Sequence, residues 1–220
     1  MPHRTIAIGD IHGHLDALKA VLQAAAPEQD DTILTLGDYV DRGPASRGVI
    51  DFLLGLRQTT NLIPLLGNHD RMFLDACDGD WAAREDWLQF GGRDTVDSYG
   101  GAVPDNVPEQ HLEFLRTCRL YYETPTHIFL HASYIPQRPM DEQPEETLLW
   151  DKLRDREPGP HCSGKQVIVG HTAQKDGRIL DLGHLICIDT CCYCDDGWLT
   201  ALDTETGQIW QADKHGQPRS

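Results

Sequence analysis

Hydrophobic residues in the first part of the chain follow two different periodicities. Short apolar runs rich in β-branched residues, typical of buried strands, occupy residues 4–9, 31–38 and 60–70. Between them lie residues 14–26 and 44–57, whose apolar positions recur every three to four residues, as in helices that cover a sheet. Because parallel strands need such helical crossovers, we predict a parallel sheet with helices packed on it.

The remainder of the chain changes pattern twice. Residues 72–123 are helical and aromatic, broken by glycine pairs and a proline-containing loop, and we expect a small helical cap there. Apolar strands return at residues 126–132 and 165–172, and residues 178–212 are typical of short antiparallel strands joined by turns. A length of 220 residues fits one domain, residues 1–220, with the cap inside it.

Polar side chains follow each predicted strand directly. The segments "GDIHG", "GDYVDRG", "GNHD", "FLHA" and "VGHT" all begin where an apolar run ends. In open α/β sheets, ligands bind beyond the carboxyl ends of the strands, so we expect these segments to converge on one edge. Taken singly, each acid or histidine is more often a turn, cap or core residue. Together and without a cation they would be poorly solvated and repel one another, so the sequence favours a metal site.

Charge and composition narrow the range of partners. Nineteen basic residues face 35 acidic ones, a formal net charge of −16. This argues against a surface for a nucleic-acid duplex, because phosphate backbones are held mainly by Lys and Arg. We find no export signal and no apolar stretch of the roughly 20 residues that a bilayer requires. Seven cysteines in this setting predict reduced thiols in a cytoplasmic protein without a membrane partner.

The ordered set "GDIHG", "GDYVDRG", "GNHD", "LHA" and "VGHT" resembles the phosphoprotein phosphatase family of metallophosphoesterases, and its bacterial members in particular. The resemblance implies a calcineurin-like α/β fold, a β-sandwich flanked by helices. It also implies two divalent metal ions, with manganese as first choice and iron or zinc as alternatives. Carried over position by position, one ion is held by Asp10, His12 and Asp38, and the other by Asp38, Asn68, His131 and His171.

The same resemblance assigns the catalytic roles. A hydroxide bridging the two ions is the expected nucleophile, so no covalent enzyme intermediate is required. His69 is the expected general acid, oriented by Asp41, and Arg42 is the expected phosphate-binding arginine. A second phosphate-binding arginine is predicted near "LLWDKLRDREPG", where Arg154 is preferred over Arg156.

The substrate depends on the cap and the loops. The form of "GDYVDRG" favours a serine/threonine phosphoprotein phosphatase that also accepts small phosphate esters. The alternative is hydrolysis of a dinucleoside polyphosphate such as diadenosine tetraphosphate. Those hydrolases also end the third motif in Asp, as Asp70 does here, whereas the phosphoprotein phosphatases usually have Glu at that position. A catalytically silent module that binds metal or nucleotide is the other alternative, and the complete set of six ligand positions argues against it.

The stretch "IDTCCYCDDGW" departs from the glycines and small residues that the family carries there. Reduced thiols in a loop are our first expectation for Cys191, Cys192 and Cys194. Redox sensitivity of these thiols is one alternative, and a separate zinc site that also uses His184 and Cys187 is another.

Overall fold

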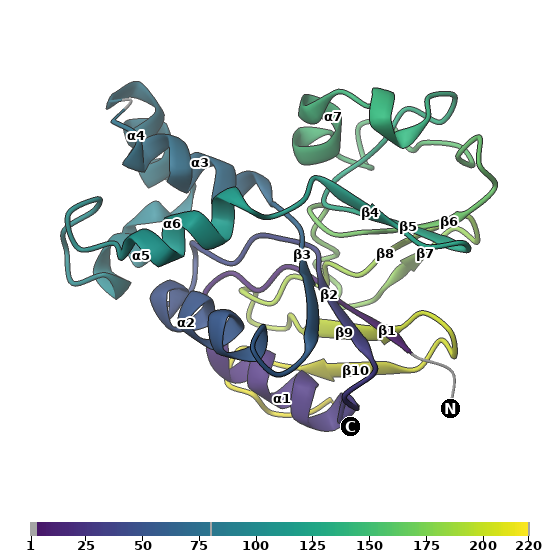
Figure 1. Ribbon diagram of the computed structural model, residues 1–220, viewed down its shortest axis with the longest axis horizontal. Helices are drawn as coiled ribbons and strands as arrows, with labels where there is room; N and C mark the ends of the chain where they lie inside the picture. Colours follow the sequence, from purple (N-terminus) through teal and green to yellow (C-terminus); the bar gives the residue numbers. More distant parts are fainter. Residues whose placement is uncertain (1–3, 80, 220) are drawn as a thin grey trace.

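Two stacked five-stranded sheets form the centre of the computed structural model, which describes residues 4–79 and 81–219. Helices cover the outer faces of both sheets, and a separate group of helices lies to one side (Figure 1). This arrangement confirms the predicted α/β sandwich flanked by helices.

The first sheet contains the segments that were predicted to be parallel strands. Its members are β1 (Thr5–Ile8), β2 (Thr32–Thr35), β3 (Asn61–Pro64), β9 (Leu199–Asp203) and β10 (Ile209–Ala212). The order is β10-β9-β1-β2-β3, with β1, β2 and β3 parallel and the β9–β10 hairpin added antiparallel beside β1. The parallel sheet predicted from the hydrophobic pattern is therefore confirmed for β1, β2 and β3.

The second sheet draws on the later half of the chain. Its members are β4 (Tyr121–Glu123), β5 (His127–Leu130), β6 (Gln166–Val169), β7 (Leu180–Asp181) and β8 (Leu185–Cys187). The order is β4-β5-β6-β8-β7, in which β5, β6 and β8 are parallel. The antiparallel arrangement predicted for the tail holds for β7–β8 and β9–β10, but these two pairs belong to different sheets.

Burial on both faces of the central strands explains their unbroken apolar runs. In β1, Ile6 and Ile8 pack in the cluster that includes α1 (Leu15–Ala25) and α2 (Ser46–Leu56), whereas Ala7 packs between the two sheets with Phe129. On the far side, α7 (Glu145–Trp150) packs its Leu148 against the outer face of the second sheet. The amphipathic pattern of the first two helices thus corresponds to one buried face each.

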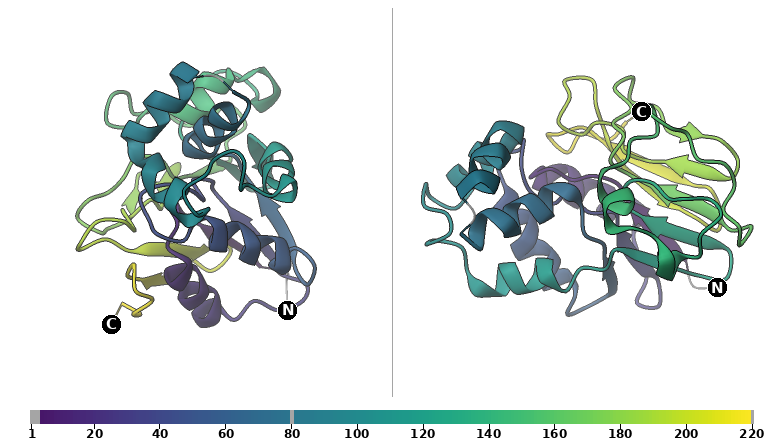
Figure 2. Two further views of the ribbon diagram at one scale, coloured as in Figure 1. Left: turned by 90° about the vertical axis from the view of Figure 1, so that its left-hand side faces the viewer. Right: turned by 90° about the horizontal axis from the view of Figure 1, so that it is seen from above.

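The group of helices beside the sandwich contains the segment predicted as a cap (Figure 2). Its elements are α3 (Asn68–Cys77), α4 (Trp81–Trp87), a π-helical turn (Leu88–Gly92), α5 (Arg93–Ser98) and α6 (Glu109–Arg116). Aromatic rings hold it together, with Phe73 at 5.4 Å from Trp87 and 5.8 Å from Tyr99 between ring centroids. The predicted range 72–123 begins inside α3 and ends with β4.

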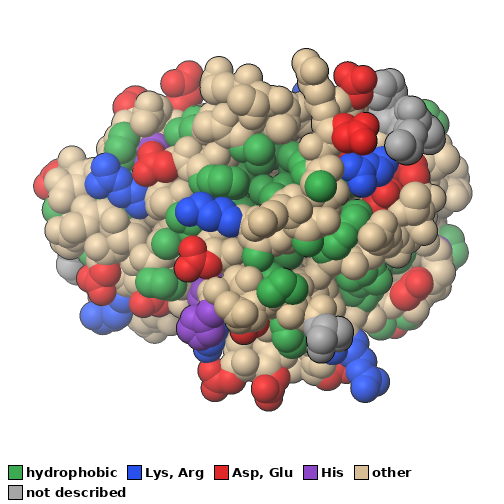
Figure 3. All heavy atoms as spheres, turned by 90° about the horizontal axis from the view of Figure 1, so that it is seen from below, with side chains coloured by type: hydrophobic (Ala, Val, Ile, Leu, Met, Phe, Trp, Pro, Cys, Tyr) green, Lys and Arg blue, Asp and Glu red, His purple; other side chains and the backbone are tan. Residues whose placement is uncertain are grey.

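The lengths of the helices and the distribution of surface charge relate to two predictions, that the protein has no membrane partner and that it does not bind a nucleic-acid duplex. Within residues 4–79 and 81–219, no helix combines the length and the apolar character that crossing a bilayer demands. On the face shown in Figure 3, Lys and Arg side chains lie scattered among acidic ones and do not form a broad basic surface. This view agrees with the net charge of −16.

Candidate metal centre and active site

The polar segments that follow β1, β2, β3, β5 and β6 meet where the carboxyl ends of the two sheets adjoin. Asp38 lies at the centre, with its carboxylate oxygens 3.4 Å from His12 Nε2 and 3.5 Å from His131 Nε2. Asn68 Oδ1 lies 3.0 Å from both His131 Nε2 and His171 Nδ1. The structure therefore brings together residues that lie up to 161 positions apart in the chain, from Asp10 to His171.

Asp10 belongs to the same cluster. Its carboxylate accepts the backbone N–H of His171 at 3.0 and 3.2 Å, which ties the end of β1 to the end of β6. Burial raises the pKa of Asp10 well above its usual value, and the neighbouring carboxylates of Asp189 and Asp38 raise it further. An unscreened negative charge is thus unfavourable here in the absence of a cation.

Backbone carbonyls fix the tautomers of the histidines. We assign the Nδ1–H of His12 as donor to Val40 O at 2.9 Å and that of His131 as donor to Leu36 O at 2.8 Å. The Nε2 atom of each ring then carries a lone pair: that of His131 lies 3.5 Å from Asp38 Oδ1, and that of His12 accepts an Arg42 N–H at 2.7 Å. Burial lowers the pKa of both histidines, so these lone pairs stay unprotonated.

His171 uses the opposite tautomer. Its Nε2–H donates to Trp150 O at 3.1 Å, and its Nδ1 lone pair faces Asn68 Oδ1. Burial lowers the pKa of His171 to about 3, so this ring is also neutral. Oxygen and nitrogen lone pairs thus face one another with no proton between them, and a metal ion would satisfy this arrangement.

Two groups of possible metal ligands emerge within the described residues: His12, Asp38 and His69, and Asp38, His131 and His171. Asp38 is common to both, as expected of a carboxylate that bridges two ions. Burial raises the pKa of Asp38, whereas the nearby imidazoles of His131, His69 and His12 lower it, and the net pKa lies below its usual range. Carboxylate, imidazole and amide donors together suit Mn, Fe or Zn, so the residues present fit a pair of divalent ions.

Left-handed backbone conformations are concentrated at this site. Among the described residues, seven that are not glycine have positive φ, and five of them are predicted site residues. The cost of such conformations is tolerated where sharp turns must aim side chains at a common point. The five are His12 (φ 44°), Asp38 (52°), Asp41 (71°), Arg42 (65°) and His171 (59°).

His69 and Asp41 form the predicted pair. His69 Nδ1 lies 2.7 Å from Asp41 Oδ2, and the His69 backbone N–H donates to Asp38 Oδ1. Asp41 is fully buried and also accepts hydrogen bonds from Thr95 Oγ1 at 2.7 Å and Trp87 Nε1 at 2.9 Å. Burial raises the pKa of Asp41, and these donors only partly offset the effect. The helices beside the sandwich thus fix the partner of His69, a role for Trp87 and Thr95 that sequence reasoning missed.

Arg42 opens onto a cavity of about 330 Å³. Its guanidinium contacts His12 Nε2 at 2.7 Å and His69 Nε2 at 2.8 Å. Arg154 lines the same cavity, whereas the exposed Arg156 does not. The cavity is lined by Asp38, Arg42, Asn68, His69, Met72, Phe90, Trp150, Lys152, Arg154, His171, Thr172, Ala173, Lys175 and Tyr193.

Asp70 and Asp189 act behind the site. Asp70 accepts the backbone N–H groups of Asp38, Tyr39 and Gly67 at 2.8–3.0 Å, so it shapes the loop that carries Asp38 and does not line the cavity. Asp189 is buried next to Asp10, and burial raises its pKa to about 6. Sequence reasoning missed Asp189, although it follows the apolar run of β8 in the same way as the predicted residues follow their strands.

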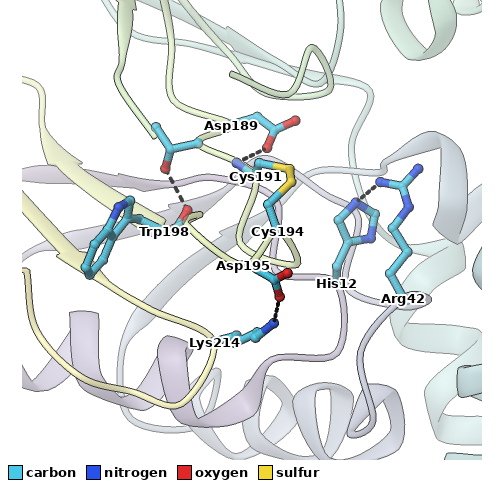
Figure 4. Close-up of a disulfide and its surroundings, with 9 residues drawn as sticks. His12, Arg42, Asp189, Cys191, Cys194, Asp195, Trp198 and Lys214 are labelled. Atoms are coloured by element: carbon cyan, nitrogen blue, oxygen red, sulfur yellow. Dashed lines mark hydrogen bonds and ion pairs between the residues drawn. A yellow bond between two sulfur atoms is a disulfide. The ribbon is translucent and has the colours of Figure 1, made fainter. Parts of the chain in front are cut away.

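The cysteines differ from our first expectation. Cys191 and Cys194 form a disulfide, which a two-residue spacing on a tight turn allows at a Cα–Cα distance of 5.4 Å (Figure 4). The expectation of reduced thiols is therefore wrong for this pair, while the other five cysteines are free. The alternative of a zinc site is also not supported, because neither potential metal group in the described chain contains a cysteine or His184.

Comparison with known proteins agrees with this geometry. A family model described as calcineurin-like phosphoesterase matches residues 3–175. Serine/threonine-protein phosphatase 1 of Salmonella typhimurium is 30% identical over 153 residues, which cover 67% of this chain and 63% of that protein. The symmetrical bis(5'-nucleosyl)-tetraphosphatase of Pseudomonas fluorescens is 42% identical over 73 residues, 33% of this chain and 24% of that one. The matched region thus spans less than two thirds of each of these relatives.

Solved structures share the fold at low sequence identity. A cold-active protein-tyrosine phosphatase of Shewanella superposes with a TM-score of 0.71 at 16% identity, covering 99% of this chain and 80% of that one. The family match, the two stacked sheets and the ring of metal-ligand side chains lead to one conclusion. The chain belongs to the calcineurin-like phosphoesterases, hydrolases that typically use a dinuclear metal centre.

Proposed function

We propose that this protein is a metal-dependent phosphatase that removes phosphate from serine or threonine side chains of phosphorylated proteins. The observation that carries the proposal is the His69–Asp41 pair, with His69 Nε2 facing the cavity beside Arg42. A serine or threonine alkoxide is a poor leaving group and needs a proton as the ester bond breaks. An imidazole held by a buried carboxylate suits that task.

The proposed metal ligands are Asp10, His12, Asp38, Asn68, His131 and His171. When bound, the two ions supply an activated water and neutralise charge on the phosphoryl oxygens. Arg42 is proposed to hold the phosphoryl group through its two guanidinium nitrogens. His69 Nε2 gives its proton to the leaving oxygen, and Asp41 stabilises the charged imidazole while it holds that proton. Asp38, besides its ligand role, accepts the His69 N–H and so fixes the distance between the two parts of the site.

Arg154 is proposed as the second phosphate-binding arginine, since its side chain lines the cavity. Substitution by Ala is expected to raise KM for a phosphate ester more than it lowers kcat, because the contact forms with bound substrate. Arg156→Ala is the matched control, since Arg156 is exposed and lies outside the cavity lining. Equal effects of the two substitutions would refute this assignment.

A second candidate function is hydrolysis of a dinucleoside polyphosphate. Lys152 and Lys175 line the cavity in addition to Arg42 and Arg154, which provides more positive charge than one phosphate requires. Phe90, 58% exposed at the cavity, is an aromatic surface on which a base could stack. The leaving group of such a substrate is a phosphate, which needs a general acid less than an alkoxide does, so we rank this activity second.

The two activities are separated by direct comparison. We would measure kcat/KM for a phosphoserine peptide and for diadenosine tetraphosphate with the same manganese-loaded enzyme. A 100-fold preference corresponds to about 2.7 kcal/mol of discrimination between transition states. Preference for the dinucleotide would overturn the protein phosphatase proposal. Failure to hydrolyse either substrate or p-nitrophenyl phosphate with Mn, Fe or Zn would favour a metal- or nucleotide-binding module.

The cytoplasmic location and the lack of a nucleic-acid duplex partner stay predictions.

A further inference from the structure

The Cys191–Cys194 turn, residues 190–197, connects β8 to β9 next to the candidate active site (Figure 4). Its backbone is closed by bonds from Cys194 N to Cys191 O at 2.8 Å and from Gly197 N to Cys194 O at 3.2 Å. The Cys191 N–H donates to Asp189 at 3.0 Å, which anchors the turn to the floor of the site. The disulfide thus braces a turn whose base is already fixed.

Close packing fixes the Cys191 end of this turn. A Cβ atom at Gly197 would collide with the Cys191 carbonyl oxygen, so the chain passes over Cys191 at a distance that only glycine permits. Cys191 itself has a left-handed φ of 59° and is fully buried, whereas Cys194 is partly exposed. The bond between the two sulfurs therefore joins a fixed end of the turn to a more accessible one.

Tyr193 stands between the two cysteines and extends into the cavity. The Cζ atom of Arg42 lies 4.5 Å from the centroid of the Tyr193 ring, a cation–π contact. The same ring meets His12 edge-on, at 5.2 Å between centroids and 85° between planes. The disulfide turn thus places an aromatic ring against the proposed phosphate-binding guanidinium.

The contacts of Arg42 show why this ring matters. The guanidinium nitrogens contact His12 Nε2 and His69 Nε2. In the proposed function, the first of these atoms is a metal ligand and the second a proton donor to the leaving oxygen. Neither is then available to Arg42, so among the contacts of this guanidinium within the described residues, the ring of Tyr193 remains to hold it toward phosphate.

We propose that Tyr193 is a positioning residue for Arg42 and that the Cys191–Cys194 disulfide keeps it in place, so that reduction of the disulfide weakens phosphate binding. The inference rests on the proposed function, because it concerns the same site and the same anion. It extends that function by making substrate affinity respond to dithiols.

The chemical step is thiol–disulfide exchange with a dithiol. One thiolate of the reductant attacks the Sγ of Cys194, which is the more exposed of the two residues, and the S–S bond breaks as Cys191 leaves as a thiolate and takes up a proton. The second thiol of the reductant then attacks the mixed disulfide and releases Cys194. Two electrons pass to the protein, which ends with two thiols, and the reductant ends as a disulfide.

The test compares oxidised protein with protein reduced by dithiothreitol, desalted without air and reloaded with the same amount of manganese. We would measure kcat and KM for p-nitrophenyl phosphate and the inhibition constant of orthophosphate. Reduction is expected to raise KM and the inhibition constant about three- to tenfold, as loss of one partly desolvated cation–π contact would, with kcat changed less than about twofold. Equal metal content in both forms excludes loss of ions as the cause.

Variants isolate the turn from other effects of the reductant. Cys194→Ser and Tyr193→Leu are expected to show the raised KM and the raised inhibition constant of orthophosphate with or without reduction. Of the two variants, Tyr193→Leu keeps the disulfide. Tyr193→Phe keeps the ring and is expected to behave as the wild type. Cys162→Ser removes an exposed, free cysteine outside the site and should leave the response to dithiothreitol intact.

The outcomes are distinct. Identical KM and inhibition constants for oxidised and reduced wild type would overturn the inference, and so would wild-type constants in Tyr193→Leu. If no form hydrolysed a phosphate ester, the proposed function would fail by itself. Amide hydrogen exchange would then still test whether the disulfide restrains Arg42 through Tyr193. Reduction should speed exchange in residues 190–197 and at the Arg42 amide. Unchanged exchange at Arg42 would overturn the inference.

Discussion

Asp41→Asn tests the proton-donating role of His69. The Asp41 carboxylate is fully buried and accepts hydrogen bonds from His69, Thr95 and Trp87 at 2.7–3.0 Å. The substitution keeps the shape of the side chain but removes the negative charge and turns one acceptor into a donor. One of the three donors then faces an N–H₂ group in a buried site, and the attraction between His69 and the residue at position 41 is weakened because the carboxylate charge is gone.

The expected size of the effect follows from the charge removed. At an effective dielectric constant of about 20, opposite charges about 4 Å apart attract by about 4 kcal/mol, which gives the order of magnitude for this pair. General acids contribute typically about 10²–10⁴-fold, or about 2.7–5.4 kcal/mol. We therefore expect kcat on a phosphoserine peptide to fall by about 10²–10³. The donor that loses its acceptor in Asp41→Asn is expected to cost about 1–3 kcal/mol of unfolding free energy.

The assay compares two leaving groups. p-Nitrophenolate leaves without help from a proton, so its hydrolysis should fall less than about tenfold in Asp41→Asn and likewise in His69→Asn. Metal content should match the wild type. Asp155→Asn makes the same change of charge at an exposed position and should leave both rates unaltered. If the two substrates lost rate by the same factor in both site variants, the reasoning about His69 as a general acid would be refuted.

Three further predictions concern metal and stability. Chelation should abolish hydrolysis, and Mn²⁺ at about 100 times its Kd should restore it and add about 2.7 kcal/mol of stability, measured as a higher Tm; an unchanged Tm would contradict a buried metal site. Gly170→Ala places a Cβ against Asp10 Oδ1 and should weaken metal binding about 10–100-fold, whereas Gly159→Ala meets nothing within 4 Å and should be neutral by metal titration. Burial lowers the pKa of His111 although Asp51 opposes the shift. The stability linked to neutral His111 is therefore present above about pH 6.5 and lost as the pH falls, so the Tm of His111→Gln should drop less than that of the wild type between about pH 7.5 and 5.5.

Some features of the site could be read from the order of residues. Asp10, Asp38 and His131 each follow an apolar run that had to be a buried strand, and parallel strands end on the same side. Local periodicity placed these residues at the ends of strands, and the resemblance to metallophosphoesterases suggested their role as metal ligands. The motif "GNHD" was predicted as the end of a strand, but Asn68 begins α3, because the chain turns into a helix directly after Gly67.

Other features needed the folded chain. Trp87 and Thr95 reach Asp41 across 46 and 54 positions, and no spacing in the sequence indicates that contact. The disulfide between Cys191 and Cys194 likewise depends on how the turn closes, since neighbouring Cys192 has the same residue type and remains a free, buried thiol.

The sequence by itself determined the alternation of strands and helices and the candidate metal ligands at the strand ends. A strand buried on both faces is a continuous apolar run, and a helix buried on one face has an apolar residue every three to four positions, so both can be recognised from neighbouring residues. The tertiary structure alone decided which strands share a sheet, which residues of the neighbouring helices hold Asp41 and which ring lies against Arg42. Those contacts join residues far apart in the chain, and their energy comes from packing and charge in three dimensions, which local pattern does not encode.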